Sequence, residues 1–207
     1  MDEPRPPCDC KDLSRFSEAP DTYESRLMGI IEADPHRRSA LQVVRDLRLP
    51  DCWIGAGFVR TAVWDSLLGR PADCRGDIDV IWFDSQRACP LRDVALQAQL
   101  SRAVPQLGWS VKNQSRMHER NGDGPYTSSF DAIKRWPETA TAVAVRLNDN
   151  AGIEVLAPFG LQDLFEGIIR PTPRFACEKQ HIFDQRYVEK GWLHRWPFLR
   201  VIALTGS

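Results

Sequence analysis

The sequence CWIGAGFVRTAVWDSLLGR, residues 52–70, is followed by GDIDVIWFD, residues 76–84, and these two stretches decide the fold. The first stretch opens with a short apolar run ending in Gly-Ala-Gly, which predicts a buried strand that runs into a turn. A helix is expected next, because one helical stripe before Gly69 holds Phe58, Val59, Ala62, Val63 and Leu67. The second stretch predicts another strand, so the two strands are joined by one helix and are expected to be neighbours.

The second strand carries two carboxylates on one face. Side chains alternate along a strand, so Asp77 and Asp79 project together while Ile78, Val80 and Trp82 face the other way. Two carboxylates held close repel each other unless they are exposed or neutralised, and a hard divalent cation neutralises them. We therefore expect Asp77 and Asp79 to be catalytic residues that bind Mg²⁺ or Mn²⁺.

The glycine turn supplies groups that bind phosphate. Glycines allow close backbone approach, and the first N–H groups of the following helix favour an anion. Arg60 lies near the first turn of that helix, where its guanidinium can form paired hydrogen bonds to phosphate oxygens. The predicted nucleotide-binding residues here are Gly55, Ala56, Gly57 and Arg60.

Both the glycine turn and the Asp-x-Asp strand also have purely structural explanations. A Gly-x-Gly turn often does no more than pack a helix on a sheet, and Asp-x-Asp often marks a solvated strand edge. A Rossmann dinucleotide site fits poorly, because Arg60 follows GFV and the third glycine of its fingerprint is missing. The P-loop pattern does not occur. Two charges inside an apolar strand favour the phosphate site.

The rest of the chain predicts a mixed α/β domain. Two helices are expected before residue 50, the second with Asp34 as N-cap and Pro35 at its first position. Beyond the second strand we expect a helix over 91–104 and a strand over 109–114, followed by a polar loop over 121–129. A short helix is then expected over 130–135, and two strands over 140–147 and 152–159 are expected to be joined by a hairpin turn. The segments 160–171 and 184–201 are predicted to be helical.

Composition sets limits on the class of protein. The chain has 207 residues, 43% of them hydrophobic, which is enough to bury one core, so we expect a single domain over residues 21–207. Residues 1–20 are rich in proline and charge and predict a disordered arm. With 27 basic and 28 acidic residues the net charge is −1, so the overall charge does not indicate a nucleic-acid partner.

The chain also lacks signals for a membrane or an oxidising compartment. No apolar run approaches the roughly 18 residues of a membrane span, and the first residues do not form a signal peptide. None of the six cysteines forms a C-x-x-C pair, and two thiols at Cys8 and Cys10 do not complete a tetrahedral metal site. We expect a cytoplasmic protein with reduced thiols and no membrane partner.

At this point the sequence resembles the nucleotidyltransferase (DNA polymerase beta-like) superfamily, whose signature is a Gly-rich turn and helix followed by a strand with Asp-x-Asp. More narrowly, it is similar to a nucleotidyltransferase-like family over about Asp21 to Pro197, through IGAGFVRTAVWDSLLG, DIDVIWFD, WSVKNQSRMH, WPETATAVAVRL and APFGLQDLF…IIRP. The resemblance implies the α+β nucleotidyltransferase fold, a mixed sheet flanked by helices with a helical C-terminal end.

The resemblance also raises the question of a third acid. The superfamily usually adds a carboxylate from a later strand, but WSVKNQ offers Lys112 and Asn113 instead. Glu154 is the remaining catalytic candidate, with an exposed strand residue as the alternative reading. Lys112 is assigned to nucleotide binding, and together with Arg116 and His118 it can contact either triphosphate or acceptor, with a solvated helix or loop face as the alternative reading.

These observations predict a Mg²⁺-dependent nucleotidyltransferase that moves a nucleoside monophosphate from an NTP to an unknown acceptor hydroxyl and releases pyrophosphate. One alternative is a catalytically inactive nucleotide-binding or protein-interaction module on the same fold. Another is a head like that of tRNA CCA-adding enzymes, which GAGFVR…LLGRP…DID also resembles, although no Glu-Asp-x-x-Arg motif follows.

Overall fold

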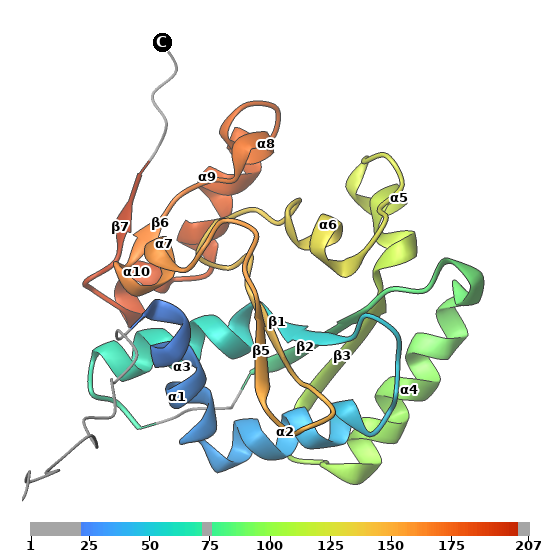
Figure 1. Ribbon diagram of the computed structural model, residues 1–207. Coiled ribbons are helices and arrows are strands. Elements are labelled where there is room, and N and C mark those ends of the chain that lie inside the picture. The colour runs from blue at the N-terminus through green and yellow to red at the C-terminus, as the bar shows by residue number, and fades with distance from the viewer. Residues whose placement is uncertain (1–21, 72–75, 203–207) are drawn as a thin grey trace, which may run out of the picture.

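A five-stranded mixed sheet forms the centre of the computed structural model, which describes residues 22–71 and 76–202 (Figure 1). The strand order is β3-β2-β1-β4-β5, with only β2 and β3 parallel to each other. The strands are β1 (Trp53–Gly55), β2 (Asp77–Trp82), β3 (Gly108–Asn113), β4 (Ala144–Leu147) and β5 (Ile153–Leu156). This arrangement confirms the predicted α+β fold and makes β1 and β2 direct neighbours.

One face of the sheet packs on four helices and forms the main core. Ile78, Val80 and Trp82 are almost fully buried on this face, as the alternation along β2 requires. The helices are α1 (Tyr23–Glu32), α2 (Pro35–Arg45), α3 (Gly57–Leu67) and α4 (Pro90–Ala103). In Figure 1, α1 and α2 lie below the strands, α3 to their left and α4 to their right. Apolar burial on this face therefore leaves the aspartates of β2 on the opposite face.

The first two predicted helices are confirmed, including the start of α2. The Asp34 carboxylate accepts hydrogen bonds from the backbone N–H groups of His36 at 2.9 Å and Arg37 at 3.1 Å, and Pro35 takes the first position. The prediction that Leu67 belongs to the buried stripe of α3 is wrong. Its side chain is 37% exposed, because the last turn of the helix extends beyond the core.

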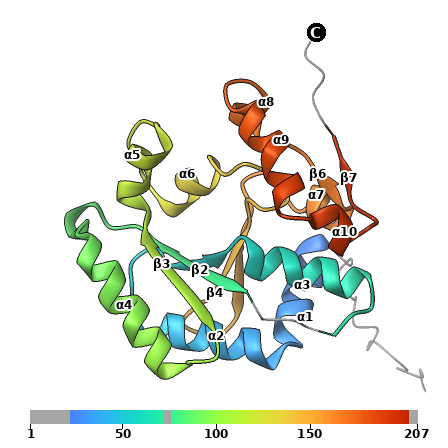
Figure 2. The ribbon, with the colours of Figure 1, turned by 180° about the vertical axis from the view of Figure 1, so that it is seen from behind.

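The remaining helices stand above the strands in Figure 1 and are seen from behind in Figure 2. Between β3 and β4 these are α5 (Met117–Asn121) and α6 (Ser129–Ile133). After β5 they are α7 (Gln162–Phe165), α8 (Pro173–Ala176), α9 (Gln180–Glu189) and α10 (Trp192–Arg195), and two 3₁₀ turns lie at Ser85–Arg87 and Gln114–Arg116. Helices α5, α6, α8 and α9 build the walls above the carboxylate-bearing face, whereas α7 and α10 pack against α3 and share its core.

The C-terminal part differs from the predicted continuous helices. Residues 168–169 form β6 (Ile168–Ile169), which pairs in parallel with β7 (Arg200–Val201). Gly167 ends α7 with a φ of +68°, and a Cβ there would lie 2.6 Å from the Phe198 ring. Gly191, at φ +60°, likewise separates α9 from α10. Long-range strand pairing and these two left-handed glycines override the helical pattern.

The predicted hairpin between β4 and β5 is confirmed, but it is shorter than expected, because residues 140–143 do not join β4. In its turn the Asn148 side chain accepts backbone hydrogen bonds from Asn150 and Gly152 at 3.0 and 2.9 Å. The left-handed residue is Ala151, at φ +59°.

Several predictions concern residues outside the described part of the chain. The arm over residues 1–20 and the thiols of Cys8 and Cys10 lie there. Within the described ranges, Cys52, Cys89 and Cys177 are free thiols. No helix in those ranges has the length and apolar character needed to cross a bilayer.

Candidate active site

The sheet register places the aspartates of β2 beside the glycine turn. Asp79 lies opposite Gly55 on β1 and opposite Ser110 on β3, whose side chain hydrogen-bonds to it. Asp77, the preceding residue on the same face of β2, is exposed, and Asp79 is half-buried. The two carboxylates therefore share one face, as predicted.

The pKa of Asp79 is raised, first by burial and then by the neighbouring charge of Asp77. Burial raises the pKa of Asp79 above its ordinary value, and the Ser110 hydrogen bond opposes that rise. The negative charge of Asp77 raises the pKa further, while Arg186 and Arg60 lower it. A cation bound between the two aspartates would relieve the repulsion.

The glycine turn divides into a packed half and an open half. A Cβ at Gly55 would lie 2.7 Å from Cη2 of Trp136, so Gly55 is required for packing. The left-handed residue of the turn is Ala56, at φ +51°, and its N–H donates to the carbonyl of Val143 at 3.0 Å. A phosphate is therefore not needed to satisfy the N–H of Ala56.

The open half is the start of α3 at Gly57. The N-cap residue makes no side-chain hydrogen bond to this end of the helix. The N–H groups of Gly57, Phe58 and Val59 occupy the first three helical positions and have no acceptor within the helix. A Cβ at Gly57 would stand 3.6 Å from Nη2 of Arg60, so that guanidinium lies beside the helix start. This end of α3 is the part of the motif suited to an anion.

Three tryptophans hold Arg60 in place. Its guanidinium carbon lies 4.4 Å from the ring centroid of Trp192, 5.3 Å from that of Trp64 and 5.9 Å from that of Trp196. Burial lowers the pKa of Arg60 to about 10, with Glu138 opposing this and Arg186 reinforcing it, so the side chain stays charged at neutral pH. Its Nε has no hydrogen-bond partner among the described residues. The sequence did not indicate that residues from α10 and its flank position this arginine.

A cavity of about 210 Å³ lies between the start of α3 and the aspartates, and we call it the turn cavity. Two of its basic residues are already paired, Arg37 with Asp34 and Arg195 with Asp65. Its lining includes Ala56, Gly57, Arg60, Asp77, Asp79, Arg186 and Lys190. The cavity thus combines two carboxylates with several cations, the composition that a nucleoside triphosphate with a metal ion requires.

A second cavity of about 400 Å³ adjoins the first. We call it the cationic cavity, and its basic lining residues are Lys112, Arg120, Arg135, Lys179 and Arg186. Asp79, Ala56 and Arg186 line both cavities. Lys112 lies here, opposite Ile81 in the register of β2 and β3, and does not line the turn cavity.

Glu138 is a residue of this region that sequence reasoning missed. It is fully buried and accepts hydrogen bonds from Nε of Arg186 at 2.7 Å and from the hydroxyl of Thr141 at 2.6 Å. The ion pair fixes Arg186, a residue of α9, between the two cavities. A glutamate inside the otherwise apolar stretch WPETATAVAV was the available signal, because buried charges need partners.

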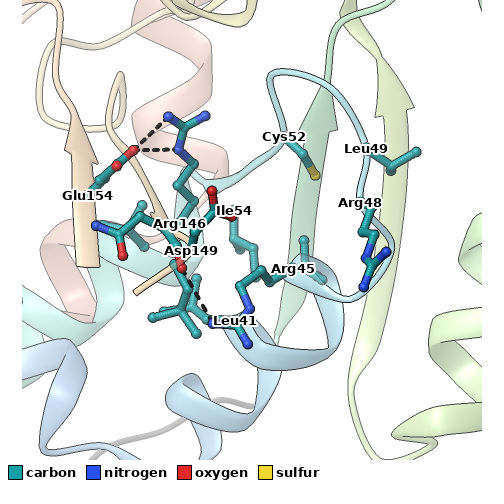
Figure 3. A pocket seen from close by; sticks show the side chains of 13 residues that line it. Leu41, Arg45, Arg48, Leu49, Cys52, Ile54, Arg146, Asp149 and Glu154 are labelled. Carbon is teal, nitrogen blue, oxygen red and sulfur yellow. Dashed lines mark hydrogen bonds and ion pairs between the residues drawn. The ribbon is translucent and has the colours of Figure 1, made fainter. Parts of the chain in front are cut away.

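Glu154 does not join the two aspartates. It lies on β5, separated from β2 by β1 and β4, and its carboxylate pairs with Arg146 at 2.6 Å. Figure 3 shows this pair among the residues that line a separate cavity of about 380 Å³. Within residues 22–71 and 76–202, no three His, Cys, Asp or Glu side chains form a group that could bind a metal ion.

Two further candidate residues have structural partners. Arg116 forms an ion pair with the buried Asp93, which also accepts a hydrogen bond from the indole of Trp82 at 2.9 Å. His118 packs edge-on against Tyr126, with ring centroids 5.9 Å apart. Arg116 therefore ties the turn after β3 to α4, and His118 packs within the wall above the sheet.

Comparison with known proteins decides the family. Residues 42–201 match the family described as nucleotidyltransferase. The chain belongs to the nucleotidyltransferase family. A solved structure described as an NMR structure that reveals a CCA-adding enzyme head domain is 34% identical, with a TM-score of 0.78 over 86% of this chain and 95% of that chain.

Larger members of this structural group share the fold at lower identity. The Thermotoga maritima CCA-adding enzyme complexed with tRNA_CCA is 19% identical with a TM-score of 0.55, over 87% of this chain and 42% of that enzyme. A tRNA-processing enzyme in its apo form I is 17% identical with a TM-score of 0.52, over 89% of this chain and 45% of that one. The chain therefore spans less than half the length of these enzymes. The search of curated proteins gives no match.

Proposed function

We propose that this nucleotidyltransferase moves a nucleoside monophosphate from an NTP to an acceptor hydroxyl in a reaction that depends on Mg²⁺ or Mn²⁺. One observation carries the proposal: Asp79 lines both cavities, with Asp77 and the start of α3 on one side. A donor bound in the turn cavity and an acceptor bound on the other side would meet at this carboxylate. The likeness to a CCA-adding enzyme head supports the same reaction class.

Asp77 and Asp79 would hold the metal ion. Magnesium sites often use only one or two carboxylates and complete their shell with water and substrate phosphates. The raised pKa of Asp79, to which Asp77 contributes, fits a pair that binds a cation. When bound, the ion would neutralise charge on the phosphates and orient them.

The triphosphate would lie at the start of α3. The N–H groups of Gly57, Phe58 and Val59 are available for its oxygens, and Arg60 is fixed beside them. Lys190 and Arg186 complete the cationic side of the turn cavity. Because tryptophans and Glu138 already hold the two arginines, little ordering is needed when the substrate binds.

In the reaction, the acceptor oxygen forms a bond to the α-phosphorus and the bond to the β-phosphate oxygen breaks. Pyrophosphate leaves, and the hydroxyl proton passes to water. The described residues offer no third carboxylate beside Asp77 and Asp79, so positioning and charge neutralisation supply most of the rate enhancement.

The test compares Asp77→Asn and Asp79→Asn with the natural chain. We expect each change to abolish Mg²⁺-dependent pyrophosphate release and to weaken Mg²⁺-dependent binding of a non-hydrolysable ATP analogue. The control is Asp149→Asn, which removes an exposed carboxylate from the β4–β5 turn. Unchanged release and binding in both active-site variants would refute the proposal.

A second candidate function is an inactive nucleotide-binding module. The observation that favours it is the missing third carboxylate near Asp79 among the described residues. Such a module would bind the ATP analogue through Arg60 and α3 but release no pyrophosphate with any acceptor. The binding and release measurements above separate the two functions.

A further inference from the structure

The cationic cavity has more positive charge than its one carboxylate balances. Five basic side chains line it, from β3, α5, the segment after α6, and the α8–α9 region, and Asp79 is its one acidic lining residue. These elements are distant in sequence and converge above the sheet (Figure 1). An anionic ligand would stabilise such a concentration of like charge.

Three of these cations are available to a ligand. Lys112, Arg120 and Arg135 are exposed, and none has an ion-pair partner among the residues that the structure describes. The other two already have partners. Arg186 forms an ion pair with Glu138, and Lys179 donates to the carbonyl of Asn121 at 2.5 Å. Surface arginines and lysines without acidic partners are the groups that bind phosphate oxygens.

The NTP alone does not account for this charge. Its triphosphate is the only anionic part, and the turn cavity already offers Arg60, Lys190 and the start of α3. The nucleoside that follows the α-phosphate is uncharged and gains little from five cations. A second phosphate-bearing molecule therefore suits the cationic cavity better.

On the basis of the proposed function, we infer that the cationic cavity binds the acceptor, and that this acceptor carries phosphate close to the attacking hydroxyl. The shared chemistry is a sugar hydroxyl next to a phosphodiester or phosphomonoester, as in the 3′ end of a nucleic-acid strand or in a small sugar phosphate. The hydroxyl would reach the α-phosphorus where the two cavities meet at Asp79.

The cavity walls also suit such a ligand. Trp136, Phe175 and Met117 line the cavity and offer apolar surface to a sugar or a base. The opposite walls are tied together, because Arg174 donates to the carbonyl of Gly122 at 2.9 Å. The cations are therefore held around the space rather than spread over a flat face.

The test uses the double variant Arg120→Gln/Arg135→Gln in the full chain. The probes are a 5′-fluorescein single-stranded RNA 12-mer with a free 3′ hydroxyl, followed by anisotropy, and ribose 5-phosphate as a competitor. We expect the double variant to bind the 12-mer about tenfold more weakly, with a salt slope smaller by about 1.4 because two phosphate contacts are lost. The matched control is Arg102→Gln/Arg200→Gln, which removes two exposed arginines outside both cavities.

The outcomes separate the inference from the proposed function. If the 12-mer binds and only the cavity variant weakens it, the acceptor is a strand. If the 12-mer does not bind, titration calorimetry measures ribose 5-phosphate directly, and its binding through the same arginines makes the acceptor a small sugar phosphate. The inference is overturned if both double variants behave alike, or if a non-hydrolysable ATP analogue displaces the probe completely. Binding of that analogue, and its loss in Asp77→Asn, reports on the proposed function alone, because Asp77 lines the turn cavity and not the cationic cavity.

Discussion

Alanine should destabilise the fold at Gly55 but not at Gly57, although the two glycines belong to one motif. In Gly55→Ala the new Cβ would lie 2.7 Å from Cη2 of Trp136 and 3.2 Å from the carbonyl oxygen of Val143. That carbonyl cannot move freely, because it accepts the hydrogen bond of Ala56 at 3.0 Å. Either the Trp136 ring or the strand pairing must therefore shift.

The magnitude follows from this overlap. Adding one carbon to a packed site costs about 1–3 kcal/mol, and the smaller conformational entropy of the unfolded alanine chain returns about 0.4–1 kcal/mol. With the middle of each range the net loss is about 1.3 kcal/mol, which lowers the Tm of a domain of this size by about 3–5 °C. Gly57→Ala adds a methyl group 3.6 Å from Nη2 of Arg60 at the first position of α3, an ordinary contact, so its Tm should be unchanged or higher.

Urea unfolding followed by tryptophan fluorescence, together with thermal melts, gives both free energies of unfolding. Binding of a non-hydrolysable ATP analogue tests the role of Gly57 in the site. Gly57→Ala should weaken this binding, because its methyl group stands at the anion-binding end of α3. The reasoning is refuted if Gly55→Ala unfolds at the same urea concentration as the natural chain, or if Gly57→Ala loses as much stability as Gly55→Ala.

Three other predictions follow from buried groups. Glu138→Gln should lower stability by about 1–3 kcal/mol and reduce turnover, because Arg186, itself 33% exposed, loses its charged partner; unchanged unfolding and turnover would contradict this role. Burial alone would raise the pKa of Asp34, but hydrogen bonds and the charge of Arg37 hold that pKa below its ordinary value, so Asp34 stabilises the fold above about pH 4. The stability difference between the natural chain and Asp34→Asn should be constant above pH ~5 and shrink as the pH falls through the folded pKa, and a difference that grows in acid would contradict the assignment. Burial raises the pKa of the Cys52 thiol to about 12, so mass spectrometry should find its alkylation by iodoacetamide at pH 8 far slower in the folded chain than in urea; equal rates would refute it.

Much of the fold was readable from the sequence because local patterns and burial agree. The alternation in DIDVIW placed Ile78, Val80 and Trp82 in the core and left the two aspartates on the other face. Asp34 and Pro35 marked the start of α2 as expected. The last third of the chain was less predictable, since β6 and β7 are only two residues long and exist through their pairing with each other.

The candidate site also has parts that local sequence patterns predict and parts that depend on tertiary packing. The sequence by itself determined the pair Asp77 and Asp79 and the helix start beside them, because strand and helix periodicity fix which neighbouring side chains share a face. Only the tertiary structure decided that Gly55 packs against Trp136, that Glu154 pairs with Arg146, and that Arg186 reaches Asp79 from α9. These contacts join segments far apart in the chain, so they depend on how the elements pack, which local sequence patterns do not encode.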